Sequence, residues 1–249
     1  MARTSFMFHA IGDVVDGDWA DVHYSYSLEK FQKFLNRVGR VDSLENLLVR
    51  SSTSEVYLTF DDGHISNYQA AKYLYDNHLG RADFFINPDL VGKPFYMNWE
   101  QLRELSEMGM SIQSHGLDHC YLSDCDDVEL HRQILESKRI IEKNIGQSVT
   151  ILAPPGGRFD QRVEKIAKQV GYKMIANSIP GHVSSKPSYL CPRVAVMREH
   201  SVDTLLGYRS RFSRSMIQQK VKYWVLKLVK MILGNQRYEK LRWQLLGEQ

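Results

Sequence analysis

The sequence predicts an α/β protein in which helices cover a parallel β-sheet. Short apolar runs alternate with longer amphipathic stretches at least five times along the chain, which is the order of β-α units. The 249 residues, of which 43% are hydrophobic and 24% charged, suit one main domain. Five or more β-α units in a chain of this size fit a barrel or an open doubly wound sheet.

The expected strands are short, and each is followed by a stretch of helical periodicity. We expect strands at residues 6–8, 56–60, 83–86, 111–113 and 149–152. The helical stretches that follow them lie at residues 28–38, 65–75, 99–108, 127–144 and 161–170. In a barrel or an open sheet, catalytic side chains belong at the carboxyl ends of such strands.

The charge is divided unevenly between the body of the chain and its C-terminal part. From Ser201 onward there are ten Arg or Lys residues and three acidic ones, so this part carries +7 and the rest −4. A helix is expected at residues 216–233, with lysines among apolar side chains, and a second one after Gly234 and Asn235. We therefore divide the chain into a catalytic domain, residues 1–212, and a basic amphipathic tail, residues 213–249.

Two partners suit this tail, and the sequence leaves both open. One is an anionic membrane surface, on which a helix too charged to span could lie. The other is the barrel itself or a second subunit, against which the apolar side would pack. A homo-oligomer thus stays open, and nothing beyond the charge points to nucleic acid.

The expected location is the cytoplasm, with peripheral membrane contact through the tail left open. The first residues lack the apolar segment of a secretory signal, and no uncharged run is long enough to span a bilayer. The three cysteines, Cys120, Cys125 and Cys191, have no metal-binding spacing and fit reduced thiols.

Two adjacent carboxylates stand where the second expected strand ends. In the motif TFDDG, Asp61 and Asp62 follow residues 56–60, and Gly63 permits the turn into the next helix. Adjacent residues that leave a strand point in different directions, so one carboxylate could bind a cation while the other binds a proton. Alone, Asp-Asp-Gly is equally typical of an ordinary polar turn.

A second polar motif, SHGLDH at residues 114–119, follows the next-but-one strand. His115 and His119 are four residues apart, so both imidazoles could reach one metal ion. An isolated pair of this kind is often only a surface feature. Together with one carboxylate, however, the two histidines complete a three-ligand set that leaves a position for water.

These residues give the chain a resemblance to polysaccharide deacetylases of the NodB-homology type, carbohydrate esterase family four. The resemblance covers about residues 5–200 and rests on TFDDG, on Ser114, His115 and His119, and on the loop APPGG at residues 153–157. It implies a distorted (β/α) barrel of about seven strands, to which the sequence adds a C-terminal helical extension.

The resemblance also implies a role for each motif residue. Asp62, His115 and His119 would bind one divalent ion, most simply zinc, although iron, cobalt or nickel would suit the same donors. Asp61 would be the general base, since a cation beside Asp62 lets the neighbouring carboxylate stay ionised. A backbone N–H in the loop of Pro155, Gly156 and Gly157 would help to stabilise the oxyanion.

The chain departs from the family pattern in two places. Many members have an arginine that orients the base just before the proline loop, where this chain has Ala153, and the late motifs that carry the usual general acid are absent. His9, His182 and His200 are the candidates for that acid. We favour His9, because residues 5–11 resemble the "YHxI" opening of one branch of the family and the first and last strands of a barrel are neighbours.

The expected function is hydrolysis of an N-acetyl or N-formyl group from an amino sugar in a surface-polysaccharide or glycolipid precursor, such as O-antigen. A nucleotide-linked or lipid-linked sugar is the expected substrate, with Tyr96 and Trp99 as weak signs of sugar stacking. The alternatives are an amidohydrolase that acts on a small non-sugar amide and a non-catalytic scaffold of a glycan-assembly complex. We consider the scaffold because the arginine before the proline loop and the late motifs are both absent. The presence of all four residues Asp61, Asp62, His115 and His119 argues against it.

Overall fold

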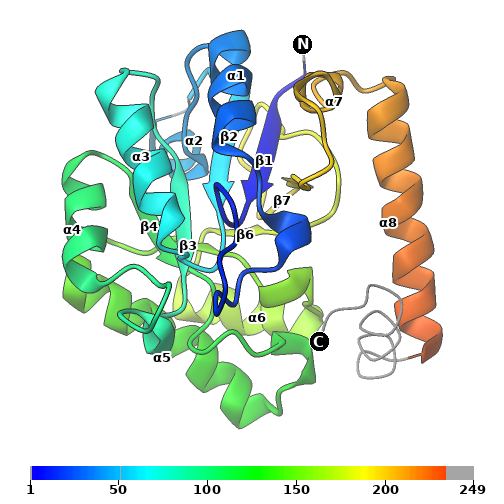
Figure 1. Ribbon diagram of the computed structural model, residues 1–249. Coiled ribbons are helices and arrows are strands. Elements are labelled where there is room, and N and C mark those ends of the chain that lie inside the picture. The colour runs from blue at the N-terminus through cyan, green and yellow to red at the C-terminus, as the bar shows by residue number, and fades with distance from the viewer. Residues whose placement is uncertain (1, 51, 234–249) are drawn as a thin grey trace.

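The computed structural model describes residues 2–50 and 52–233, and it confirms the expected fold class. One parallel sheet has the strand order β7-β6-β5-β4-β3-β2-β1-β8, with helices packed around it (Figure 1). The strands are β1 (Thr4–Phe8), β2 (Val56–Phe60), β3 (Asp83–Ile86), β4 (Ser111–Ser114), β5 (Ile151–Leu152), β6 (Met174–Ala176), β7 (Leu190–Cys191) and β8 (Val194–Ala195).

The helices lie close to the expected ranges. They are α1 (Leu28–Val38), α2 (Leu44–Arg50), α3 (Ser66–Asp76), α4 (Trp99–Glu107), α5 (Asp127–Ile145), α6 (Gln161–Val170), α7 (Val202–Gly207) and α8 (Arg214–Leu233). Short 3-10 turns occur at η1 (Val22–Tyr24), η2 (Pro88–Leu90), η3 (Leu122–Asp124) and η4 (Pro155–Gly157). The helix α2 and the last three strands were not expected as separate elements.

The sheet is a curled half-barrel, and its first strand lies beside its last. The strand β1 pairs in parallel with β2 on one side and with β8 on the other, where Phe6 is opposite Val194 and Met7 is opposite Ala195. Within the residues that the structure describes, the sheet has eight strands, whereas about seven were expected. The difference lies in the short strands β7 and β8, which have two residues each. The pairing of β1 with β8 places Arg193, which directly precedes β8, beside β1, and its long side chain reaches from there to Asp61 at the end of β2.

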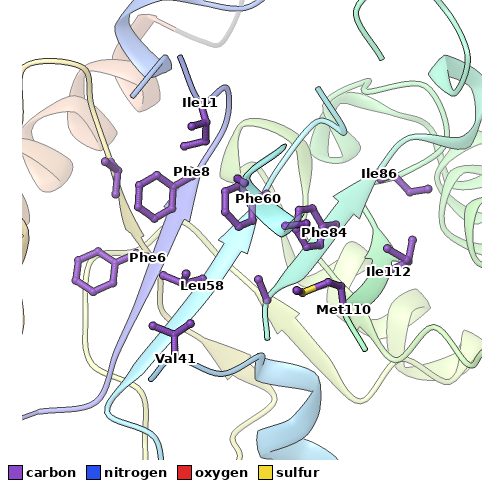
Figure 2. Packing of buried hydrophobic residues seen from close by; sticks show 14 of the residues in the cluster. Phe6, Phe8, Ile11, Val41, Leu58, Phe60, Phe84, Ile86, Met110 and Ile112 are labelled. Carbon is purple, nitrogen blue, oxygen red and sulfur yellow. The ribbon is translucent and has the colours of Figure 1, made fainter. Parts of the chain in front are cut away.

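An aromatic ladder on the helix-covered face fixes the central strands. The rings of Phe60 and Phe84 stack with centroids 4.8 Å apart, and Phe8 lies 5.6 Å from Phe60 (Figure 2). Every residue of β1 and β2 is buried, as is usual for parallel strands covered on both faces. Removing this much aromatic surface from water is a major contribution to stability, and it leaves the strand ends as rigid supports.

A second apolar cluster fills the inside of the curl. It is made of Leu44, Leu47, Tyr57, Phe85, Ile151, Ala153, Met174, Ala176, Val183 and Cys191. The side chains of β2, β3, β5 and β6 that point away from the ladder meet here. Any charged group that enters this region from the strand ends must find a partner, because water is excluded.

The C-terminal helix expected at residues 216–233 is present as α8, which begins at Arg214. The second helix, expected after Gly234 and Asn235, lies outside the described residues. Within residues 2–50 and 52–233, no helix has the length and apolar character needed to cross a membrane. The boundary between a catalytic domain, 1–212, and a tail, 213–249, stays a prediction.

Candidate active site

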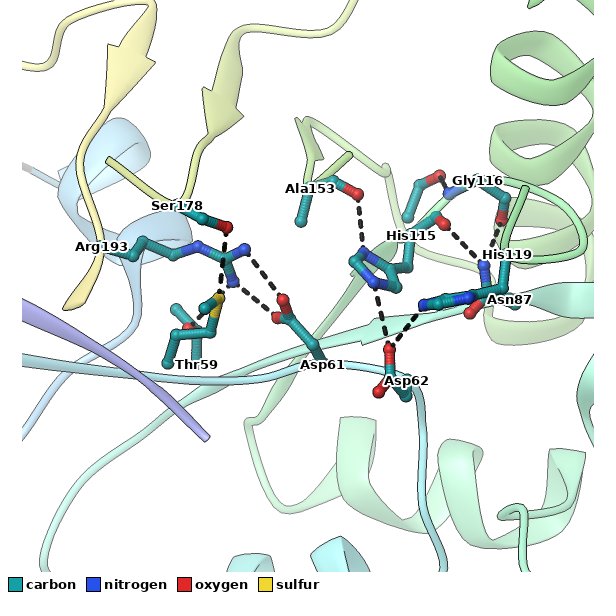
Figure 3. A network of polar contacts seen from close by, with 12 residues as sticks. Thr59, Asp61, Asp62, Asn87, His115, Gly116, His119, Ala153, Ser178 and Arg193 are labelled. Carbon is teal, nitrogen blue, oxygen red and sulfur yellow. Dashed lines mark hydrogen bonds and ion pairs between the residues drawn. The ribbon is translucent and has the colours of Figure 1, made fainter. Parts of the chain in front are cut away.

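The carboxyl ends of the central strands bring the predicted site residues together. Asp61 and Asp62 follow β2, His115 follows β4, and His9 follows β1 (Figure 3 shows the first three). Asp62 has φ 70° and His119 has φ 72°, in the left-handed region that residues other than glycine seldom adopt. Such backbone strain persists where the surrounding structure imposes it, and it is concentrated at functional sites.

Asp62, His115 and His119 form a compact cluster of donor atoms. The Nε2 atoms of His115 and His119 each lie 3.1 Å from Oδ1 of Asp62, and one donor atom from each residue lies within 4.8 Å of the others (Figure 3). The His115 side chain is buried, whereas that of His119 is 40% exposed. The cluster is therefore open to solvent on the His119 side.

The hydrogen bond of His115 indicates what the cluster can bind. Its Nδ1 lies 2.7 Å from the carbonyl oxygen of Ala153, which can only accept, so Nδ1 carries a proton. In the neutral ring, Nε2 then presents a lone pair to the Asp62 carboxylate, an unfavourable pairing unless a proton or a cation lies between them. The donor set therefore fits a divalent ion.

The electrostatics of the cluster keep Asp62 ionised. Burial alone would raise the pKa of Asp62, but the contacts with His115 and His119 outweigh it and hold the pKa well below its usual range. Burial would likewise lower the pKa of His119, yet the Asp62 carboxylate raises it. An ionised carboxylate is the form that binds a cation.

Asp61 has a different partner, which the sequence did not reveal. Arg193 donates from Nη1 and Nη2 to the two oxygens of Asp61, at 2.6 and 2.9 Å, and its side chain is fully buried (Figure 3). Such two-point pairing fixes the orientation of the carboxylate. An arginine thus pairs with Asp61 although position 153, just before the proline loop, is alanine.

Three further contacts hold the Arg193 guanidinium. It donates from Nη1 to Thr59 Oγ1 at 3.1 Å and from Nε to the Asn177 carbonyl oxygen at 3.2 Å, and it lies 5.0 Å from the centre of the Phe85 ring. A buried arginine with this many partners is a positioned group. The sequence signal that could have identified Arg193 is a charged residue within the otherwise apolar stretch CPRVAV, residues 191–196.

His9 is placed as predicted, beside the cluster. It lines a small cavity together with Asp62, His64, Trp19 and Tyr24, and its ring lies 4.6 Å from that of Tyr24. Its Nδ1 atom is buried and has no hydrogen-bond partner among the described residues. A buried imidazole nitrogen without a partner can exchange a proton with a bound substrate.

The other two candidate histidines belong to a different part of the molecule. His182 Nε2 lies 3.1 Å from the carbonyl oxygen of Tyr208, and His200 Nδ1 accepts from the N–H of Met197 at 3.1 Å. Burial lowers the pKa of both side chains. Neither contributes to the cavity that His9 lines, so of the three candidate histidines only His9 lies beside the cluster.

The loop of Pro155, Gly156 and Gly157 forms η4, directly after the carbonyl that holds His115. A Cβ on Gly156 would lie 2.8 Å from the Tyr121 ring, and one on Gly157 would lie 2.7 Å from Ser178, so both positions require glycine. The N–H of Gly157 already donates to the carbonyl oxygen of Pro154. Gly156 is therefore our choice for the oxyanion donor.

A segment near the N-terminus supplies a wall of the site that the sequence did not predict. Asp18 contacts His64 at 3.1 Å with both side chains buried, and Trp19 stacks on Tyr96 with centroids 4.4 Å apart. Tyr96 also lines a cavity with Asp62, whereas Trp99 does not contribute to it. Of the two aromatic residues suggested for sugar stacking, the structure places Tyr96 at the site.

The fold and this site define an α/β half-barrel protein with a cluster of three residues, at its strand ends, that could hold a metal ion. The family model for polysaccharide deacetylases matches residues 49–175, just over half of the 249 residues, and the chain belongs to this family of hydrolases that act on N-acetyl amide bonds. The matched segment contains the TFDDG motif, both histidines and the proline loop. It excludes His9 and Arg193.

Individual relatives agree with this assignment. The chain is 31% identical over 142 residues to YxkH of Bacillus subtilis, named as a polysaccharide deacetylase, with 57% of this chain and 51% of that protein covered. It is 31% identical over 121 residues to the peptidoglycan-N-acetylglucosamine deacetylase of Bacillus cereus, with 48% and 54% covered. The chain thus spans about half the length of these curated relatives.

A solved structure shows the same fold over most of the chain. The Streptococcus pyogenes deacetylase PplD, in complex with acetate, superimposes with a TM-score of 0.74 at 23% identity. The superposition covers 84% of this chain and 99% of PplD. At this level of identity, the likeness establishes the fold alone.

Replacing His115 with alanine should remove a bound divalent ion. Purified wild-type protein loaded with zinc and then desalted should retain about one ion per chain by elemental analysis, since three donors converge on one point. His115→Ala should retain almost none. His131→Ala, on the exposed side of α5, is the matched control and should keep the wild-type content. Equal metal in the wild type and His115→Ala would contradict the assignment.

Replacing Arg193 with lysine should lower turnover without loss of metal. Lysine keeps a positive charge beside Asp61 but cannot make the two-point contact, so the carboxylate would be misoriented. We expect kcat to fall by roughly 10²-fold with little change in KM, because displacements of about 1 Å have effects of that size. Metal content and thermal unfolding serve as controls. Unchanged kcat in a folded, metal-loaded variant would show that Arg193 does not position the base.

Proposed function

We propose that the protein is a metal-dependent hydrolase that removes an N-acetyl or N-formyl group from an amino sugar. The observation that carries this proposal is the pairing of two adjacent carboxylates with different partners. Arg193 holds Asp61, whereas His115 and His119 face Asp62. One carboxylate is therefore available for a cation and the other for a proton.

Each residue of the site then has one task. A divalent ion held by Asp62, His115 and His119, most simply zinc, would supply a Lewis acid for the amide carbonyl and for the attacking water. Asp61 accepts the proton of that water through a lone pair not used by Arg193, since each carboxylate oxygen has two. His9 donates a proton to the departing amine, and the N–H of Gly156 stabilises the oxyanion.

An amino sugar in a glycan precursor is the substrate class that the relatives support. The Bacillus cereus relative is named for peptidoglycan N-acetylglucosamine, and a Bradyrhizobium protein that is 25% identical over 140 residues, covering 55% of this chain and 62% of that protein, is named for chitooligosaccharide. Trp19 and Tyr96 supply aromatic faces beside the cluster, which suits a sugar ring. We propose a lipid-linked or nucleotide-linked sugar of surface-polysaccharide or O-antigen assembly; the cytoplasmic location and a homo-oligomeric state stay predictions.

A non-catalytic scaffold is no longer the best alternative for this chain. The scaffold was prompted partly by the missing arginine before the proline loop. Arg193, which lies between β7 and β8, would supply that group, and its contacts with Asp61 are buried and short. Burying such an ion pair is costly unless its geometry is favourable, which supports selection for a working base.

The purified, zinc-loaded protein should release acetate or formate from N-acylated amino sugars. We would incubate it with UDP-N-acetylglucosamine, a chitooligosaccharide, a lipid-linked N-acetylglucosamine and the N-formyl counterparts, and measure free amine and carboxylate by mass spectrometry. His9→Ala should keep the metal and lose about 10²–10⁴-fold in turnover, the usual range for a positioned acid.

Two controls make this assay decisive. Asp61→Asn should bind zinc and be inactive, and His200→Ala should be nearly as active as the wild type because His200 lies against Tyr208 and Met197. Release from a small non-sugar anilide but from no sugar would favour the general amidohydrolase. Loss of activity in His200→Ala with retention in His9→Ala would overturn the assignment of the acid.

A further inference from the structure

The helix α8 carries an apolar stripe along one side that no other part of residues 2–50 and 52–233 covers. It follows α7 and runs along the edge of the molecule (Figure 1). Six apolar side chains on it are between 50% and 71% exposed: Ile217, Val221, Trp224, Val225, Leu228 and Ile232. Their spacings of one, three and four residues place them on a single face, about one-third of the helix circumference wide.

The packing of α8 does not use this stripe. Its inward contact is made near its start by Met216, which is fully buried in the main core. Contiguous exposed apolar surface of this kind is uncommon on soluble proteins and marks a contact with a partner or a membrane. The stripe is therefore a surface that needs an occupant.

The charges around the stripe select that occupant. The helix contains Arg214, Lys220, Lys222, Lys227 and Lys230 and no acidic residue. The Lys227 ammonium lies 4.8 Å from the centre of the Trp224 ring, so its aliphatic stem runs beside the stripe while its charge stays at the rim. A second copy of α8 would bring five further positive charges to the same place, which is unfavourable.

We propose that α8 lies flat on an anionic membrane surface, with the stripe among the lipid headgroups and upper acyl chains. Apolar burial and attraction of the flanking lysines to acidic lipids act together in such helices. Trp224 stands in the middle of the stripe, and tryptophan favours the membrane interface. The sequence after α8 also mixes basic and apolar residues. Its basic residues include Arg237, Lys240 and Arg242, and its apolar ones include Leu241, Trp243 and Leu245.

The inference does not depend on catalysis, so it can fail or succeed separately from the proposed function. We would measure co-sedimentation of the full-length, zinc-loaded protein with vesicles of pure phosphatidylcholine and of phosphatidylcholine with 30% phosphatidylglycerol, roughly a physiological share of acidic lipid. The wild type should bind the anionic vesicles at least about tenfold more tightly, and 1 M salt should abolish the difference.

Variants of the apolar stripe and of the helix lysines separate the contribution of apolar burial from that of charge attraction. Trp224→Ser combined with Leu228→Ser should weaken binding to anionic vesicles about tenfold or more, as should replacement of the four helix lysines by glutamine. Val128→Ser, at a position 83% exposed on α5, is the matched control and should bind like the wild type. Asp61→Asn should also bind normally while lacking activity.

Two results would overturn the proposal. One is binding to anionic vesicles that the stripe and lysine variants leave unchanged. The other is a stable dimer in light scattering that Trp224→Ser with Leu228→Ser converts to a monomer, because a second copy would then cover the stripe.

Discussion

The site depends on giving two adjacent carboxylates separate partners in a largely buried place. Burying two like charges this close is costly unless each has its own positive partner. Arg193 is that partner for Asp61, and a cation held together with the two imidazoles would be that partner for Asp62. The left-handed backbone at Asp62 turns the second carboxylate away from the first, so the two sets of partners do not compete.

Much of the fold can be understood as support for that separation. The aromatic ladder of Phe8, Phe60 and Phe84 fixes the strand from which both aspartates emerge. The parallel pairing of β1 with β8 places Arg193, just before β8, where its side chain reaches Asp61, although the two residues are 132 positions apart in the sequence. The carbonyl of Ala153, at the end of β5, orients His115. Several strands thus hold the two aspartates and His115 in place.

The sequence predicted the parts of the site that lie in local motifs. The alternation of apolar runs and amphipathic stretches predicted the class of fold. The motifs TFDDG, SHGLDH and the proline loop predicted the three segments that meet at the site, because each motif follows a recognisable strand. Arg193 was not predicted as a site residue, because β8 has only two residues and Asp61, the partner of Arg193, is distant in sequence. The wall formed by Asp18 and Trp19 was not predicted either. Neither residue lies in a periodic segment, and their contacts with His64 and Tyr96 join positions that are distant in sequence.

The most direct test of the separated carboxylates is anomalous X-ray diffraction at the zinc edge from crystals soaked in zinc. This account predicts one strong peak within about 2.0–2.2 Å of donor atoms from Asp62, His115 and His119. In the same crystals, Asp61 should still receive both hydrogen bonds from Arg193 and make no bond to the ion. A zinc ion ligated by Asp61, or one that displaces Arg193 from it, would contradict the division of labour between the two residues.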